Sequence, residues 1–226
     1  MHHHYAAAKI RQEVQHILQR SEAQKDPTKP LPPSATSLPF NPALLTPASM
    51  PYTLAAFNEA LRLYPPIPFE IRQAQSPQTL PDGTFLPKDS IVVWCLWATG
   101  RSRLTWGEDA DLFRPERWLA TPEDGGGEGG EGGEGGEGAR PRLVQKSPSE
   151  FPVFNGGPRA CLGKKMAEII AVQVIGSVAW AFDFVPAYEG PERSSKSSLT
   201  LPMEGGLPVL AKARSRVVGG EEGCVL

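Results

Sequence analysis

The chain has 226 residues, of which 40% are hydrophobic, and its formal net charge is −2. This length suffices for one domain with a sizeable core, and a charge this close to zero does not predict a nucleic-acid partner. Three cysteines without regular spacing argue against a disulfide framework and fit a reducing compartment.

Two amphipathic helices are predicted in the N-terminal part. Residues 9–18 have the pattern of the first helix. In 51–64, apolar side chains recur at three- and four-residue steps, so a second helix has one apolar face: Leu54, Phe57, Leu61 and Tyr64. Pro51 suits the first turn of this helix, and Pro65-Pro66 stops it. Glu59 and Arg62 lie one turn apart on the other face, where such a pair is usually solvated and weak.

Extended structure is predicted next. Pro81-Asp82-Gly83-Thr84 is typical of a turn between extended segments. The run 91–96 is rich in β-branched and aromatic residues and predicts a strand, in which Cys95 has core packing as its default role. A separate motif follows at 113–118, reading Phe-Arg-Pro-Glu-Arg-Trp.

A Gly/Glu-rich tract occupies 123–138 and contains no apolar residue. Because it cannot bury a core, we expect a flexible insert over 121–148. The tract holds six acidic residues, which leaves 23 basic against 19 acidic residues elsewhere, a net charge of +4. The folded part is therefore mildly basic.

The segment 154–163 is the most informative part of the chain, and it reads Phe-Asn-Gly-Gly-Pro-Arg-Ala-Cys-Leu-Gly. Its glycines let the backbone turn tightly and approach a flat macrocycle. Cys161 suits a thiolate bonded to haem iron, and the guanidinium of Arg159 suits a haem propionate. The alternative is a buried structural cysteine after a glycine turn.

A largely apolar helix is predicted over 166–182, and it has no charged residue after position 168. At this length it suits a buried core helix better than a membrane span. The last residues, 213–226, are expected to form a disordered tail.

The segment 154–163 matches the haem-binding loop of cytochromes P450, Phe-x-x-Gly-x-Arg-x-Cys-x-Gly, at every fixed position. The Glu-x-x-Arg helix and the Pro-Glu-Arg element resemble two further P450 motifs, in the family's order. The resemblance implies the C-terminal portion of one P450 domain over 1–226, mainly α with small antiparallel β-sheets. It also implies that haem b is bound by the loop, with Cys161 as the axial ligand of the iron. The other cofactor-binding loop residues are Phe154, Gly157, Arg159 and Gly163.

The resemblance also implies roles for residues outside the loop. Glu59, Arg62 and Arg117 would form a buried charge cluster that supports the haem loop. Arg72 corresponds to a family arginine that often binds a propionate, and its alternative is an ordinary strand-surface arginine. Two apolar segments correspond to substrate contacts but would equally suit core packing: Ile67, Pro68 and Phe69, with Leu201, Pro202 and Met203.

The implied activity is haem-dependent monooxygenation of a lipophilic substrate with O2. Electrons would come from NADPH through cytochrome P450 reductase or an equivalent donor, which would dock on the face bearing Lys164 and Lys165. Residues 80–87 and 106–119 look most like plant and fungal fatty-acid ω-hydroxylases. The family further implies a monomer on the cytosolic face of the endoplasmic reticulum membrane, with no nucleic-acid partner.

The sequence is about half as long as a complete P450. It contains neither a membrane anchor nor the family's oxygen-activating helix, so we expect the C-terminal half of a longer enzyme. Two alternatives remain open: a non-enzymatic fragment, and a P450-like isomerase or dehydratase of hydroperoxides. Enzymes of the latter kind often have an altered cysteine loop, whereas this loop is unaltered.

Overall fold

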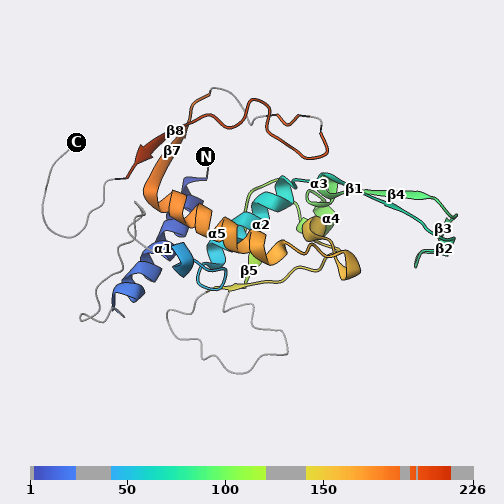
Figure 1. Ribbon diagram of the computed structural model, residues 1–226, viewed down its shortest axis with the longest axis horizontal. Helices are drawn as coiled ribbons and strands as arrows, with labels where there is room; N and C mark the ends of the chain where they lie inside the picture. Colours follow the sequence, from blue (N-terminus) through green and yellow to red (C-terminus); the bar gives the residue numbers. More distant parts are fainter. Residues whose placement is uncertain (1–2, 24–41, 121–140, 189–193, 197, 215–226) are drawn as a thin grey trace, which may run out of the picture.

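The computed structural model describes residues 3–23, 42–120, 141–188, 194–196 and 198–214. Three long helices form its centre: α1 (His4–Ala23), α2 (Pro51–Leu63) and α5 (Lys164–Ala181). Figure 1 shows α5 lying across α1 and α2, with a long β-hairpin at one end of this group and a second one at the other. The expected mainly α fold with small antiparallel sheets is confirmed.

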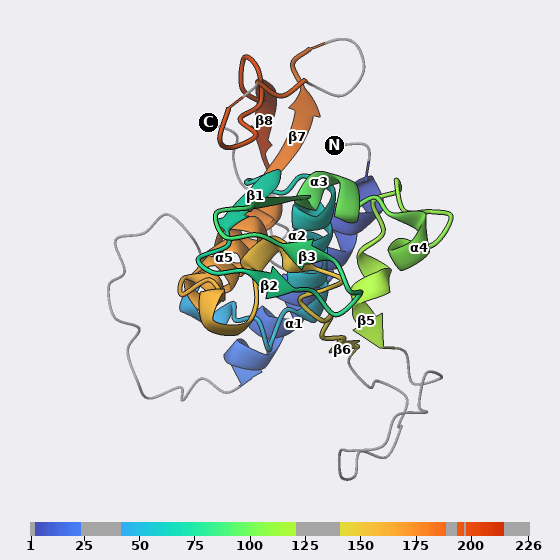
Figure 2. The same cartoon turned by 90° about the vertical axis from the view of Figure 1, so that its right-hand side faces the viewer.

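Within the described residues, four two-stranded antiparallel sheets accompany the helices. Strand β1 (Phe69–Gln73) pairs with β4 (Ile91–Cys95), and β2 (Gln78–Thr79) pairs with β3 (Phe85–Leu86). The other two sheets join β5 (Leu119–Ala120) to β6 (Arg142–Leu143), and β7 (Phe182–Pro186) to β8 (Val209–Ala213). In Figure 2 the hairpin that carries β1 to β4 points toward the viewer, with β2 and β3 in front.

Short helical turns connect these elements. They are η1 (Pro42–Leu44), α3 (Leu96–Thr99), α4 (Arg103–Trp106), η2 (Pro115–Trp118), η4 (Pro152–Phe154) and η5 (Gly157–Arg159). The Sγ of Cys95 accepts a 3.4 Å hydrogen bond from the amide of Ala98, so this partly buried cysteine caps α3.

The main core lies where α1, α2 and α5 meet. Helix α1 contributes Ile10, Val14 and Ile17, whose spacing places them on one face. Gly176 of α5 lets the helix approach the segment before α2, since a Cβ there would lie 2.9 Å from Cδ1 of Leu45. Val172 of α5 belongs to the same cluster, so the first and last long helices of the described residues share one core.

The start of α2 is capped by a side chain from α1. The N-cap residue Met50 makes no side-chain hydrogen bond. Instead the carboxylate of Glu13 accepts hydrogen bonds from the amides of Tyr52 and Thr53, at 2.6 and 2.9 Å. Backbone N–H groups at a helix start attract negative charge, so Glu13 both caps α2 and joins it to α1.

Two predicted segment limits are wrong. Residues 142–143 form β6 inside the interval expected to be a flexible insert, because their backbone pairs with Leu119 and Ala120. Residues 121–140 of that interval lie outside the described residues. The expected tail also starts too early: Ala213 pairs with Phe182, and Arg214 donates a 2.9 Å hydrogen bond to Asp183. The rest of the tail, 215–226, lies outside the described residues.

Helix α5 is less buried than expected. Of its 18 residues, Val172, Gly176 and Ser177 are buried. One apolar stripe is exposed to solvent, with side chains at helical spacing: Met166, Ile169, Ile170, Val174 and Val178. None of the described helices is long and apolar enough to cross a membrane. The stripe is therefore an exposed apolar surface on a helix that buries only a narrow face.

Candidate functional site

The cysteine loop begins where η4 ends. Asn155 has φ 55° and ψ −170°, and Gly157 has φ 57°, so two of three consecutive residues have a positive φ. The amide of Cys161 donates a 2.8 Å hydrogen bond back to the carbonyl oxygen of Phe154, which closes the loop. A left-handed Gly157 is the conformation for which glycine is the favoured residue.

Cys161 lies at the open side of this loop. The residue is exposed, and so are its neighbours Ala160 and Leu162. Its carbonyl oxygen accepts a hydrogen bond from the amide of Lys164 at 3.3 Å, so the cysteine adjoins the first turn of α5. The alternative of a buried structural cysteine is therefore wrong for the described residues, because Cys161 is exposed.

Two arginines expected at the haem line one cavity of about 440 Å³. Arg72 comes from β1 and Arg159 from η5, and the cavity walls between them include Trp94 and Asn155. The guanidinium of Arg72 lies 5.2 Å from the centre of the Trp94 ring. Arg72 is not an unpaired surface arginine, since its Nη1 also lies 2.8 Å from a carboxylate oxygen of Glu70.

The donor set fits a haem group. One exposed thiol and two guanidinium groups match the needs of one iron and two propionates. Gly157 leaves the outer surface of the loop open, because a Cβ at this position would meet nothing within 4 Å. Phe154 and Gly163 frame the loop at its two ends. The haem roles of these residues stay predictions.

The three side chains of the expected charge cluster meet at Glu59. Arg62 donates to both oxygens of this carboxylate at 2.8 Å, and Nε of Arg117 donates to one of them at 2.9 Å. The amide of Arg114 and the indole of Trp118 add two further bonds, at 2.8 and 2.9 Å. The side chains of Glu59 and Arg62 are 0% exposed. The solvated alternative for this pair is therefore wrong.

The charged state of Glu59 is favoured by its partners. Burial would raise the pKa of Glu59, but the hydrogen bonds from Arg62, the Arg114 amide and Trp118 outweigh it and lower the pKa. A carboxylate that accepts several hydrogen bonds is stabilised as the anion. The cluster is thus ionised and satisfied without any group from outside.

The two arginines of the cluster also bind backbone carbonyl groups. Arg62 donates to the carbonyl oxygens of Gly100, of Ala110 at 2.6 Å and of Leu112 at 3.0 Å. Arg117 donates to the carbonyl oxygens of Trp106 and Asp109, at 3.2 and 3.1 Å. The bonds from Arg62 hold the segment 100–112 against α2, and those from Arg117 hold it against η2.

Sequence reasoning missed several members of this network. Trp118 donates through its indole, and Asp109 accepts from Arg117 at 3.4 Å, although neither was expected to contribute. Gly100 lies against the end of α2, where a Cβ would overlap the carbonyl oxygen of Arg62. A tryptophan directly after Pro-Glu-Arg was the one signal that could have pointed to the indole contact.

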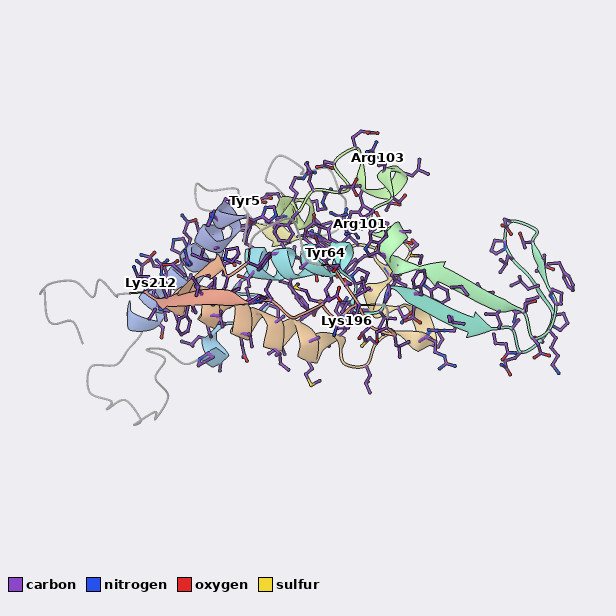
Figure 3. The ribbon with its side chains drawn as sticks, turned by 90° about the horizontal axis from the view of Figure 1, so that it is seen from above. Tyr5, Tyr64, Arg101, Arg103, Lys196 and Lys212 are labelled. Carbon is purple, nitrogen blue, oxygen red and sulfur yellow. The ribbon has the colours of Figure 1, made fainter. Side chains whose placement is uncertain are left out.

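The two expected substrate segments are adjacent. The amide of Leu201 donates a 3.0 Å hydrogen bond to the carbonyl oxygen of Pro66, just after α2. Figure 3 labels Tyr64, Arg101 and Lys196 in this part of the molecule, with Lys196 on the late turn. Pro68 is buried, whereas four other members are exposed: Ile67, Phe69, Pro202 and Met203. Their role as substrate contacts stays a prediction.

Comparisons with known proteins agree with the motifs. The family described as "Cytochrome P450" matches residues 1–207. Cytochrome P450 94A1 of Vicia sativa is 37% identical over 166 residues, which are 73% of this chain and 30% of that protein. Alkane hydroxylase MAH1 of Arabidopsis thaliana is 37% identical over 159 residues, 70% of this chain and 28% of that protein.

Solved structures show the same relationship. The crystal structure of a cytochrome P450, CYP102L1, superposes with a TM-score of 0.63 at 25% sequence identity. This similarity covers 93% of the chain and 39% of the solved chain. The chain spans about a third of the length of the curated relatives that it matches.

Proposed function

This chain belongs to the cytochrome P450 family, and we propose that it supplies the haem-thiolate part of a P450-type monooxygenase. The observation that carries the proposal is the exposed Cys161 at the open side of a loop that matches the family motif throughout. An axial ligand of haem iron requires both a cysteine at this position of the motif and a thiol that the iron can reach.

The residues that would hold haem come from three parts of the chain. Cys161 would bind the iron, with Phe154, Gly157 and Gly163 shaping the loop around it. Arg159 and Arg72 would bind the propionates, since both line the cavity between the loop and β1. When bound, haem supplies activation of dioxygen, from which one oxygen atom enters a substrate C–H bond and the other leaves as water.

The proposed substrate is a lipophilic molecule with a long alkyl chain. One relative at 37% identity is named an alkane hydroxylase, and the sequence resembles fatty-acid ω-hydroxylases. The adjacent segments 67–69 and 201–203 present mostly apolar side chains, which suits a hydrocarbon chain. A long-chain fatty acid is the specific substrate that we propose.

The proposed electron donor is NADPH-cytochrome P450 reductase or an equivalent protein. Lys164 and Lys165 are exposed directly behind the cysteine loop, where positive charge would favour encounter with an acidic partner. Lys164 also lies 3.9 Å from Glu168, which leaves Lys165 as the less engaged of the two. We place the full-length enzyme at the cytosolic face of the endoplasmic reticulum membrane, as a monomer.

The exposed apolar stripe of α5 supports the proposal that this chain works as the C-terminal part of a larger P450 domain. Val174 is 54% exposed, and Ile170 is 51% exposed. Apolar side chains at helical spacing on one face are the pattern of a surface that packs against another element. Monooxygenase activity would then require the remainder of the domain.

Haem binding tests the proposal directly. Titration of the chain with haem, followed by reduction under carbon monoxide, should produce the Soret band typical of a thiolate ligand. Cys161→Ala should abolish this band. Cys95→Ala is the matched control, because Cys95 is a second free cysteine whose Sγ accepts a hydrogen bond from the amide of Ala98 at the start of α3, and its replacement should keep the band.

A haem-free fragment is the second candidate, because the exposed stripe of α5 shows that this chain by itself leaves an apolar face uncovered. A folded, soluble chain that produces no thiolate-type band with haem would support this candidate. The same assay on the chain joined to the N-terminal two thirds of a relative distinguishes a chain that never binds haem from one that binds it only in the complete domain. A band that appears there and depends on Cys161 would retain the haem proposal for the complete domain.

A further inference from the structure

Glu70 joins the cysteine loop to the arginine on β1. One oxygen of its carboxylate, Oε1, accepts a 3.1 Å hydrogen bond from Nδ2 of Asn155. The other oxygen, Oε2, accepts a 2.8 Å hydrogen bond from Nη1 of Arg72. The Glu70 side chain is only 14% exposed, so water competes weakly for both bonds.

The alternation of β1 places Glu70 and Arg72 on the same face. Both are partly buried, whereas Phe69, Ile71 and Gln73 on the opposite face are exposed. Trp94 of β4 lies beside Arg72 and lines the same cavity. The strand therefore presents a carboxylate and a guanidinium side by side toward the cysteine loop.

Asn155 is the residue at which the loop turns away from η4. Its backbone is left-handed, and a Cβ on the next residue, Gly156, would lie 2.8 Å from Cβ of Pro148. An ionised carboxylate only accepts hydrogen bonds, so the amide nitrogen of Asn155 must face Glu70. This bond holds the loop at the point where its direction is set, one residue after the Phe154 carbonyl that binds the Cys161 amide.

We propose that Glu70 is a positioning residue for the haem site, acting through Asn155 and Arg72. With one oxygen it holds the start of the cysteine loop in register with β1. With the other it orients the Arg72 guanidinium in the cavity shared with Arg159. The inference rests on the proposed haem function, but the bond between Glu70 and Asn155 exists without haem, so part of the test does not require the cofactor.

Two substitutions of Glu70 separate its two contacts. Glu70→Ala removes both hydrogen bonds. Glu70→Gln keeps an amide oxygen for Asn155 but places an NH2 group against the Arg72 donors. Asn155→Ala removes the loop contact, and it also places alanine at a positive φ, which adds backbone strain. Gln73→Ala is the matched control, because it shortens an exposed side chain on the opposite face of the same strand.

The first measurement is hydrogen exchange of the haem-free chain over residues 154–161. Glu70→Ala and Asn155→Ala should each reduce protection of this segment about tenfold, as expected for loss of one charge-assisted hydrogen bond. The double variant should lose less protection than the sum of the two single losses, because both substitutions remove the same bond. Glu70→Gln and Gln73→Ala should leave this protection close to wild type.

The second measurement is haem affinity together with the Soret band under carbon monoxide. Glu70→Ala and Glu70→Gln should raise the Kd for haem about tenfold, because both disturb the contact with Arg72. Glu70→Ala and Asn155→Ala should shift the Soret band partly from the thiolate type to the thiol type, because both release the loop.

Two results would overturn the inference. One is additive losses of loop protection in the double variant. The other is wild-type protection together with wild-type haem binding in the variants of Glu70. A wild-type chain that binds no haem while the exchange coupling is present would overturn the proposed function but leave the coupling between Glu70 and the loop.

Discussion

The charge cluster at Glu59 and the cysteine loop are two polar sites of opposite character. The Glu59 carboxylate has five hydrogen bonds from four residues of its own chain, and its side chain is 0% exposed. At the loop, Cys161 and Arg159 are exposed and line open surface. The chain completes the first site by itself, whereas the second keeps its bonding groups available to a ligand. Supporting structure and binding surface are thus separated in space.

The largest effect that tests this contrast is expected at Glu59. Glu59→Gln has the same shape but leaves two buried guanidinium groups without a carboxylate, so it should lower the free energy of unfolding by about 3–5 kcal/mol. Urea unfolding of both proteins measures the difference. Glu108→Gln is the control, since its side chain is 90% exposed and should not matter. Equal losses of unfolding free energy for Glu59→Gln and Glu108→Gln would contradict the stabilising role of the buried cluster.

The pH dependence of stability should show the same cluster. Because the folded state lowers the pKa of Glu59, its stabilising contribution is complete above the unfolded-state pKa of about 4.3 and is lost as the pH falls through the lower folded-state value. The difference in unfolding free energy between wild type and Glu59→Gln should therefore shrink as the pH is lowered below about 4. A difference that stays constant from neutral to acidic pH would show that the charge of Glu59 is not responsible.

Gly100 tests the packing around Arg62. A Cβ at this position would overlap the backbone carbonyl oxygen of Arg62, which cannot move without disturbing α2. Gly100→Ala should therefore destabilise the chain by about 1–3 kcal/mol in thermal or urea unfolding. Gly176→Ala is the matched comparison: its Cβ would meet the flexible end of Leu45, and a gain in helix propensity offsets the strain. A smaller loss of unfolding free energy for Gly100→Ala than for Gly176→Ala would contradict the tight packing of Gly100 against Arg62.

The cap supplied by Glu13 should have a smaller effect. Glu13→Ala leaves the first amides of α2 without their carboxylate partner and should cost about 0.5–2 kcal/mol in unfolding free energy. Gln12→Ala, on an exposed position of the same helix, controls for the change in α1 itself. Glu13→Gln should recover part of the loss, because an amide oxygen still accepts a hydrogen bond from α2.

The smallest effect on stability is expected at the residue that matters most for the proposed function. Cys161 is exposed, so Cys161→Ala should change the unfolding free energy of the haem-free chain by less than about 0.5 kcal/mol. Differential scanning calorimetry without haem would check this. A large loss would indicate that the thiol supports the fold, and the contrast with Glu59 would then disappear.

Local secondary structure was the part of the molecule that the sequence predicted best. The helix at 51–63, the strand at 91–95 and the turn at 81–84 follow from apolar spacing, β-branched composition and turn residues, which act over a few neighbouring positions. The limit of the flexible insert was wrong because β6 has only two residues, and the limit of the tail was wrong because the end of β8 is held by a partner strand distant in the sequence. A two-residue strand leaves no periodic pattern in a sequence.

The sequence by itself determined the helices, the order of the motifs and the position of the one cysteine set in a glycine-rich loop, since each depends on residues close together in the chain. Only the tertiary structure decided that Glu13 caps α2, that Trp118 completes the Glu59 cluster and that Glu70 reaches Asn155. These contacts join residues 40, 59 and 85 positions apart. Such pairs form because packing of helices and strands brings them together, and no local preference along the chain specifies them.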